Sequence, residues 1–228
     1  MRILHIEDDP TLRFWVKTGL SREGFAVDGA AGAKEGVQMA CENTYDIILL
    51  DIAMPDHDGF WALRTLRQSG QMAAIFMISG QAGEPEKLMA FEAGADDYMV
   101  KPIFITELVA RIRVWLKRQE SVQTNPTAVT EVSVGALHLD FLKHRATIRG
   151  RQVSLTPKEF MVLEYLMRRA GRLVTQTALS QAVWNQDFET STNVVEVHIN
   201  RLRKKIDEDG KPSLIQTVRG SGYLLEIQ

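Results

Sequence analysis

Apolar residues in the first half of the chain form short continuous runs, and these alternate with longer segments of helical spacing. Residues 47–50 are four apolar residues in a row, which is typical of a strand buried on both faces of a sheet. Shorter or interrupted apolar runs at residues 2–6, 25–27, 74–78 and 98–100 predict four further strands. Between them, apolar residues recur every three or four positions, as in helices that bury one side. Five strand–helix repeats predict an α/β domain with a doubly wound, five-stranded parallel sheet over residues 1–119.

The second half has a different pattern. Short strand-like segments over residues 132–153 predict a small antiparallel sheet. A capping box of Thr156, Pro157 and Glu159 begins a helix, and two further helices are expected at about 174–184 and 192–206. A hairpin with a glycine turn is predicted at residues 215–227. Together these elements predict an α+β winged helix-turn-helix domain over residues 131–228, after a flexible linker at 120–130.

Composition narrows the class of protein. The chain of 228 residues suits two modest domains, and Cys41 is its only cysteine, which argues against an internal disulfide or a cysteine metal cluster. No apolar run approaches the ~20 residues of a membrane span, and the start lacks the long apolar core of a signal peptide. We therefore expect a cytoplasmic protein without a membrane partner. Residues 1–125 carry a net charge of −5 and residues 126–228 carry +3, which suggests different partners for the two domains.

Asp51 ends the apolar run at residues 47–50. Taken alone, an Asp in this position more often caps the segment that follows. However, the carboxyl ends of parallel strands meet at one rim of the sheet. The other predicted strands end at Glu7 and Asp8, at Ser79 and at Lys101. Such crowding of charged groups costs stability unless function or an ion compensates, which favours a functional site at this rim.

The residue types at the rim indicate a chemistry. Three carboxylates that lie close together cannot all stay ionised without a cation, and carboxylate oxygens suit Mg²⁺. A carboxylate, a divalent ion, a lysine and a hydroxyl form a phosphoryl-transfer set. Asp51 would be the nucleophile that forms an acyl phosphate, Lys101 would place a positive charge on the phosphoryl group, and the Ser79 hydroxyl would donate a hydrogen bond to it.

The first 119 residues resemble the receiver domain of two-component response regulators, which has a flavodoxin-like fold. The matching residues are Glu7-Asp8, Asp51, Met54-Pro55, Asp58-Gly59, Ser79 and Lys101-Pro102. The resemblance implies that a histidine kinase or a small acyl phosphate phosphorylates Asp51. It also implies that the backbone carbonyl of Ala53 is a further metal ligand. Tyr98 resembles the aromatic residue that turns inward when the serine moves toward the phosphoryl group, although a half-buried strand aromatic is an equally good interpretation.

Charged residues on the expected fourth helix, fifth strand and fifth helix have the spacing of the dimer face of the OmpR/PhoB subfamily. A solvated surface with paired charges is the alternative interpretation. Because both the signs and the spacing agree, we favour a homodimer face between residues 87 and 118. Its residues are Lys87, Asp96, Asp97, Glu107, Arg111 and Arg118.

The second half resembles the DNA-binding effector domain of the same subfamily, through residues 155–160, 197–205 and 217–223. The resemblance implies that the third helix lies in a major groove and that the hairpin contacts the minor groove or its phosphates. A basic helix end in solvent is the alternative for its last lysines. The implied DNA-binding residues are Trp184, Asn193, His198, Asn200, Arg201, Arg203, Lys204, Thr217 and Arg219. Relatives often carry Arg in place of Asn193 and Asn200, so we predict a shallower salt dependence of DNA binding.

These features are combined in one hypothesis: a phosphorylation-dependent transcriptional regulator of a two-component system. The resemblance implies binding to tandem DNA half-sites, a cognate histidine kinase, and RNA polymerase as a possible further partner. It implies self-catalysed dephosphorylation but no metabolic enzyme activity. One rival is a phosphatase with an aspartyl nucleophile, which is disfavoured because Ala53 stands where such enzymes have a second Asp. Another is a constitutive DNA-binding protein, against which the complete rim argues.

Overall fold

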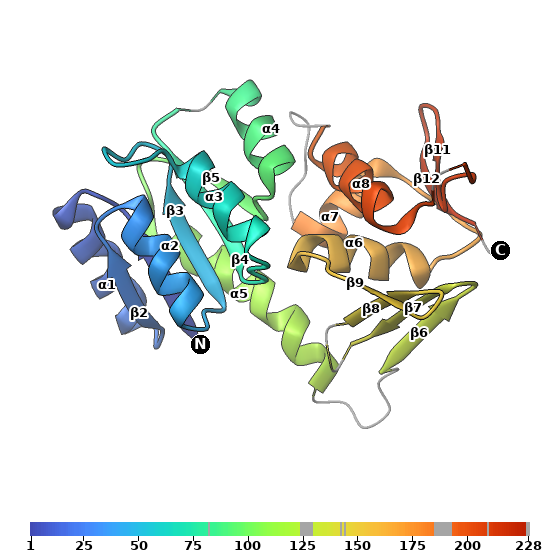
Figure 1. Cartoon of the computed structure of the whole chain (residues 1–228), viewed down its shortest axis with the longest axis horizontal. Helices are drawn as coiled ribbons and strands as arrows, with labels where there is room; N and C mark the ends of the chain where they lie inside the picture. Colours follow the sequence, from blue (N-terminus) through green and yellow to red (C-terminus); the bar gives the residue numbers. More distant parts are fainter. Residues whose placement is uncertain are drawn as a thin grey trace. The chain divides into compact units, whose positions relative to one another are not determined.

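The computed structural model describes residues 1–81, 83–123, 130–141, 143, 145–184, 193–208 and 210–226, with side chains left out at 116–123 and 193 (Figure 1). The chain divides into two compact units, Met1–Arg113 and Val114–Gln228. Each unit is described by itself. The division falls within one helix, and residues 124–129 of the predicted linker lie outside the described residues. The domain limits given above therefore stay a prediction.

The first unit is built on five parallel strands in the order β2-β1-β3-β4-β5. The central strand β3 and its neighbour β4 are buried along their whole length, as their continuous apolar runs predict. The strands are β1 (Arg2–Ile6), β2 (Ala26–Ala30), β3 (Ile47–Asp51), β4 (Ala74–Ser79) and β5 (Asp97–Val100).

Helices cover both faces of this sheet. Gly19 lies against Ile105, so α1 and α5 are neighbours, whereas α2 contacts α3 and α3 contacts α4. Asp9 and Asp58 cap α1 and α3 with their carboxylates. The doubly wound fold is therefore confirmed. The helices are α1 (Pro10–Arg22), α2 (Ala33–Glu42), α3 (Gly59–Gln68), α4 (Glu84–Ala93) and α5 (Ile105–Gln123).

Strand β2 differs from its prediction at residues 25–27. It runs from Ala26 to Ala30 and includes Asp28 and Gly29, which interrupt the apolar pattern. Asp28 is stabilised there by Arg2 of the neighbouring strand, whose guanidinium lies 2.8 Å from its carboxylate. Cross-strand pairing thus extends the strand through residues that hydrophobicity alone excludes.

The second unit begins with a four-stranded antiparallel sheet in the order β6-β7-β8-β9. Three helices follow, and a smaller sheet in the order β10-β12-β11 forms the wing. The predicted winged helix-turn-helix is confirmed. Its elements are β6 (Glu131–Val134), β7 (Leu137–Asp140), β8 (Arg145–Ile148), β9 (Arg151–Val153), α6 (Pro157–Met167), β10 (Leu173–Val174), α7 (Gln176–Trp184), α8 (Asn193–Ile206), β11 (Ile215–Val218) and β12 (Gly222–Leu225).

Two glycines are required by close backbone approach. A Cβ on Gly59, at the start of α3, would lie 2.2 Å from the carbonyl oxygen of Asp51. A Cβ on Gly222, at the start of β12, would lie 2.1 Å from the carbonyl oxygen of Val174, and its φ of 145° also favours glycine. Gly59 therefore lets α3 begin directly beside the end of β3, where Asp51 lies.

Among the described helices, none is both long enough and apolar enough to cross a membrane.

Candidate functional sites: an acidic rim and a basic helix

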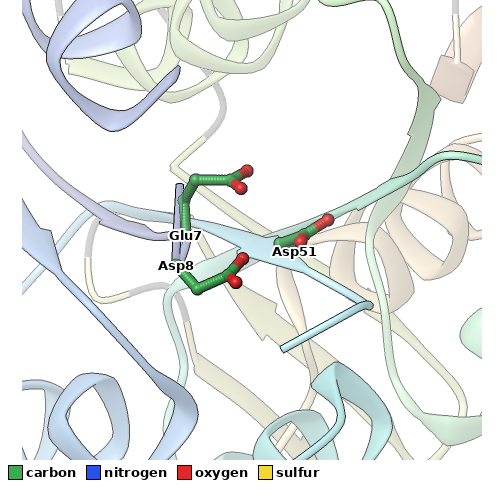
Figure 2. A group of neighbouring side chains, drawn as sticks. All are labelled: Glu7, Asp8 and Asp51. Atoms are coloured by element: carbon green, nitrogen blue, oxygen red, sulfur yellow. The ribbon is translucent and has the colours of Figure 1, made fainter. Parts of the chain in front are cut away.

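Glu7, Asp8 and Asp51 meet at the carboxyl end of the parallel sheet. They follow or end β1 and β3, which are neighbours in the sheet, and each offers a carboxylate oxygen within 4.8 Å of the others. Figure 2 shows Glu7 and Asp8 directing their carboxylates toward the side on which Asp51 lies. Glu7 and Asp51 are each only 1% exposed, whereas Asp8 is exposed to solvent. The rim thus joins two buried anions to one that solvent reaches.

Lys101 is the cation that faces this rim. Its Nζ lies 3.0 Å from Oδ1 of Asp51 and 3.1 Å from Oε2 of Glu7, and it donates a hydrogen bond of 3.3 Å to Oε1 of Glu7. The first two contacts have ion-pair distances without hydrogen-bond geometry, so in the described part of the chain those two buried oxygens accept no hydrogen bond. The position of Lys101 is set by its backbone, because its N–H donates to the carbonyl of Ser79 at 2.7 Å.

The titration of these groups reflects their crowding. Burial raises the pKa of Asp51 above its ordinary value of 3.8, against the opposing effect of Lys101. Burial and then the charge of Asp51 raise the pKa of Glu7. Burial alone would lower the pKa of Lys101, but Asp51 and Glu7 raise it above its ordinary value of 10.5. One lysine does not balance three carboxylates, so the donor set fits a hard divalent cation.

Ser79 and Tyr98 lie beside the rim, at the end of β4 and within β5. Both are buried, with exposures of 2% and 5%. The Tyr98 hydroxyl points inward, 3.0 Å from the carbonyl oxygen of Gln81 and 3.1 Å from Oε2 of Glu86. The Ser79 hydroxyl donates to the same Oε2 at 3.2 Å. The two predicted switch residues are therefore linked through one carboxylate, which the sequence motifs did not indicate.

In the second unit, α8 presents a polar stripe next to the wing. Glu196, Asn200 and Lys204 are exposed at intervals of four residues, which places them on one side of the helix. A groove of about 490 Å³ lies between this helix, the start of α7 and the wing. Its lining includes Thr177, Glu196, Arg203, Thr217 and Ser221. This surface can contact a polyanion through its polar and cationic side chains.

Arg201 lies on the other side of α8, where it is paired within its own domain, and its contact with DNA stays a prediction. Its guanidinium lies 2.9 Å from Oε1 of Glu159, and the Arg201 side chain is only 15% exposed. Lys205 donates to Oε2 of the same carboxylate at 2.6 Å. Glu159 is completely buried and also accepts the N–H of Thr156, which closes the capping box of α6. Arg201 is needed there because a buried carboxylate must be paired.

The sequence motif placed His198 and Trp184 at the DNA-binding surface, whereas the structure buries both side chains. His198 is 0% exposed and Trp184 is 7% exposed. Their rings pack edge to face with centroids 4.9 Å apart, and Nδ1 of His198 lies 2.9 Å from the carbonyl of Val194. Helical periodicity explains the error, because position 198 follows Val194 and precedes Leu202 on the apolar face.

Most of the other residues predicted to contact DNA are exposed or partly exposed. Asn200, Lys204, Thr217 and Arg219 are exposed. Arg203 is partly exposed and holds α8 to the wing, since it donates to the carbonyl of Ile215 at 2.6 Å and to the Thr217 hydroxyl at 2.8 Å. The side chain of Asn193 lies outside the described residues. DNA binding by these residues stays a prediction.

Comparison with known proteins agrees with the architecture. A family model described as "Response regulator receiver domain" matches residues 3–113, and one described as "Transcriptional regulatory protein, C terminal" matches residues 150–225. The transcriptional regulatory protein PcoR of Escherichia coli is 37% identical over 227 residues, covering 100% of this chain and 98% of that protein. The transcriptional activator protein IrlR of Burkholderia pseudomallei is 39% identical over 228 residues, covering 100% and 97%.

Solved structures show the same two-part fold over nearly the whole chain. A mutant of RitR has a TM-score of 0.77 at 28% identity and covers 98% of both chains. DrrB of Thermotoga maritima, described as an OmpR/PhoB homolog, has a TM-score of 0.51 at 27% identity and covers 99% of this chain and 98% of its own. This chain is a response regulator of the OmpR/PhoB family. It combines a receiver domain with a DNA-binding domain and is a transcriptional regulator.

The predicted dimer face of the regulator requires one correction. Asp96 is 0% exposed, and its Oδ2 lies 2.5 Å from Nη2 of Arg67 on α3. The same oxygen accepts the N–H of Ile75 at 2.9 Å. Asp96 therefore joins β4, β5 and α3 inside the receiver and does not lie on its surface. Arg67 strengthens the junction by donating to the carbonyls of Gly94 and Ala73 at 3.0 and 2.9 Å.

Other residues of that face pair within the receiver. Arg111 binds Asp97 at 3.1 Å and Glu107 at 2.8 Å. Lys87 is partly buried, and burial lowers its pKa below the ordinary value of 10.5 although Asp97 opposes this. The side chain of Arg118 lies outside the described residues. The role of these residues in dimers stays a prediction.

Asp56 is a further residue that the sequence motifs missed. It follows β3 and accepts the N–H groups of Ala33 and Lys34 at 3.0 and 2.9 Å, which caps α2 in place of a side chain on Gly32. Burial raises the pKa of Asp56, but hydrogen bonds from Lys34 and Ala33 outweigh it and lower that pKa to about 2. The cap ties the loop that carries Ala53 to a neighbouring helix. An Asp after Met-Pro gives no signal of a contact made across more than twenty residues.

Proposed function

We propose that a phosphoryl group on Asp51 controls this regulator. The observation that carries the proposal is Nζ of Lys101 at 3.0 Å from Oδ1 of Asp51, beside Glu7 and Asp8 with oxygens within 4.8 Å. A buried carboxylate at a strand end, next to a fixed cation, suits a nucleophile whose product carries more negative charge. A cap or a structural ion pair does not require two further carboxylates at the same place.

The chain's own residues supply most of the reaction. A carboxylate oxygen of Asp51 attacks the phosphorus of a phosphohistidine or an acyl phosphate. The new bond joins this oxygen to phosphorus, and the bond from phosphorus to the donor breaks and leaves its electron pair on the donor atom. Lys101 places its charge beside the transferred group, and Ser79 turns its hydroxyl toward it. Glu7, Asp8, Asp51 and the carbonyl of Ala53 would hold Mg²⁺, which when bound offsets the charges of carboxylate and phosphoryl oxygens.

The phosphorylated aspartate is a signal in this proposal, and the protein is not a metabolic enzyme. Slow self-catalysed hydrolysis returns Asp51 to the carboxylate. The cognate donor is a histidine kinase, as the receiver domain implies. Such a role suits a chain in which the receiver accompanies a DNA-binding domain rather than a second catalytic domain.

Phosphorylation favours a homodimer through the face of Lys87, Asp97, Glu107, Arg111 and Arg118. The dimer brings two winged helices to tandem half-sites, where α8 enters the major groove and the wing contacts the backbone. The DNA-binding residues are Asn200, Arg203, Lys204, Thr217 and Arg219, with Asn193 at the start of α8. RNA polymerase is a further partner, and the regulator works in the cytoplasm, where its DNA lies.

The test couples phosphorylation to assembly. The full chain is incubated with acetyl phosphate and Mg²⁺, and its mass in solution and its affinity for a DNA fragment from its own promoter region are measured. We expect a shift from monomer to dimer and tighter DNA binding for the wild type, and neither change for Asp51→Asn. An unchanged wild type, or an equal response of Asp51→Asn, would refute the proposal.

A further inference from the structure

A carboxylate on α4 holds both switch hydroxyls. Glu86 lies in the first turn of the helix, and its Oε2 is 3.2 Å from Oγ of Ser79 and 3.1 Å from the hydroxyl of Tyr98. These residues come from three elements: β4, α4 and β5. One charged oxygen therefore connects the residue expected to contact the phosphoryl group with the aromatic residue expected to report on it.

The hydrogen-bonding capacity of Ser79 makes this contact a constraint. A serine hydroxyl has one proton to donate. In this structure Ser79 accepts the N–H of Gln81 at 3.0 Å and directs its proton to Glu86. The same proton cannot be donated to a phosphoryl oxygen on Asp51. Ser79 lies next to Ile78, which pairs with Asp51 in the sheet, so the Asp51 carboxylate is on the adjacent strand end.

We propose that Glu86 is a positioning residue that competes with the phosphoryl group for the Ser79 hydroxyl. This inference rests on the proposed phosphorylation of Asp51. When the phosphoryl group is absent, the charged Glu86 oxygen holds Ser79 and Tyr98 against the first turn of α4. When the phosphoryl group is present, the Ser79 hydroxyl donates its hydrogen bond to a phosphoryl oxygen in place of the Glu86 carboxylate. Glu86 then keeps its hydrogen bond to Tyr98.

Losing the hydrogen bond between Ser79 and Glu86 lowers the net affinity for the phosphoryl group. A hydrogen bond to a charged acceptor is stronger than one between neutral groups, so giving up Glu86 reduces the net gain from the new contact. Replacing the carboxylate with an amide of similar size weakens the competition, and removing it abolishes the competition. The affinity for a phosphoryl analogue should therefore increase from the wild type to Glu86→Gln and again to Glu86→Ala.

The test uses beryllofluoride with Mg²⁺, a phosphoryl analogue, titrated into the full chain by calorimetry. We expect Glu86→Ala to bind about ten-fold more tightly than the wild type, the effect of one hydrogen bond to a charged group at the lower end of its usual strength, with Glu86→Gln between them. Glu84→Ala is the matched control, because Glu84 is an exposed carboxylate in the same helical turn. Its affinity should equal that of the wild type. Circular dichroism checks that each variant is folded.

A double-mutant cycle separates competition for Ser79 from a general charge effect. In a Ser79→Ala background, Glu86→Ala should leave the beryllofluoride affinity unchanged. The inference is overturned if Glu86→Ala matches Glu84→Ala, if it weakens binding, or if its effect persists without the serine hydroxyl. A wild type that binds no beryllofluoride overturns the proposed function as well, so the two failures are distinguishable.

Discussion

The acidic rim of the receiver and the Glu159 cluster of the DNA-binding domain both gather charged side chains around buried carboxylates, but their charge balance is opposite. At the rim, three carboxylates lie together, and among the described residues Lys101 is the cation that pairs with two of them, Glu7 and Asp51. In the Glu159 cluster, one carboxylate binds Arg201 and Lys205 and also caps α6. A surplus of carboxylates costs stability and is kept for a function, whereas a carboxylate that is paired with two cations and caps a helix serves the architecture. The comparison predicts opposite responses when an anion is removed from each group.

The largest expected effect is in the Glu159 cluster. Glu159→Ala should lower the free energy of unfolding of its domain by about 3–5 kcal/mol, because it leaves two cations without their buried partner and opens the capping box. Chemical unfolding of the full chain, followed by circular dichroism, measures it. Glu164→Ala on the same helix removes a partly exposed carboxylate that pairs with Arg168 at 2.8 Å, and should change stability by less than about 1 kcal/mol. Equal losses of stability in the two variants would contradict the claim that the Glu159 cluster holds its domain together.

A satisfied carboxylate next to the rim should also cost stability when it is removed. Asp56→Ala eliminates the cap of α2 and should destabilise the receiver by about 1 kcal/mol, the usual value of a helix cap. Thermal unfolding without Mg²⁺ measures this loss. A variant as stable as the wild type would show that the two N–H groups are equally well satisfied by water.

Neutralising the rim itself should have the reverse sign. Asp51→Asn removes one of the crowded carboxylates, whose pKa burial has raised, and should stabilise the metal-free receiver by an amount of the order of 1 kcal/mol. The measurement is the same thermal unfolding, with a chelator present. Destabilisation by Asp51→Asn would mean that the ion pair with Lys101 outweighs the repulsion, and the rim would then resemble the Glu159 cluster.

The smallest effect concerns the cations of α8. Lys204 is exposed, so Lys204→Ala should reduce the slope of log affinity against log salt concentration by about 0.9, the loss of one phosphate contact. Arg201→Ala should leave that slope unchanged, because Arg201 is bound to Glu159. The measurement is DNA binding at several salt concentrations with folded variants. A smaller salt slope for Arg201→Ala, with the slope of Lys204→Ala unchanged, would mean that Arg201 contacts a phosphate, as the sequence motif predicts.

The same contrast explains what the sequence could predict. The rim residues follow from topology, since the ends of parallel strands meet wherever the strands run. The direction of side chains on α8 does not follow from residue type. The motif around Arg201 and His198 suggested surface residues, but the structure buries His198 and pairs the partly buried Arg201 with Glu159. Asp96 was misplaced for a related reason: its partner Arg67 lies on another helix, and no local pattern indicates the pairing. Tertiary partners, rather than motifs, decide which charged residues reach solvent.

The most direct test of the central claim is the intact mass of the full chain after incubation with acetyl phosphate and Mg²⁺. The account predicts the addition of one phosphoryl group to the wild type, and none to Asp51→Asn. Lys101→Ala should accept it more slowly, because the cation beside Asp51 is lost. A wild type that gains no mass, or an Asp51→Asn variant that gains the same mass as the wild type, would contradict the assignment of Asp51 as the phosphoryl acceptor.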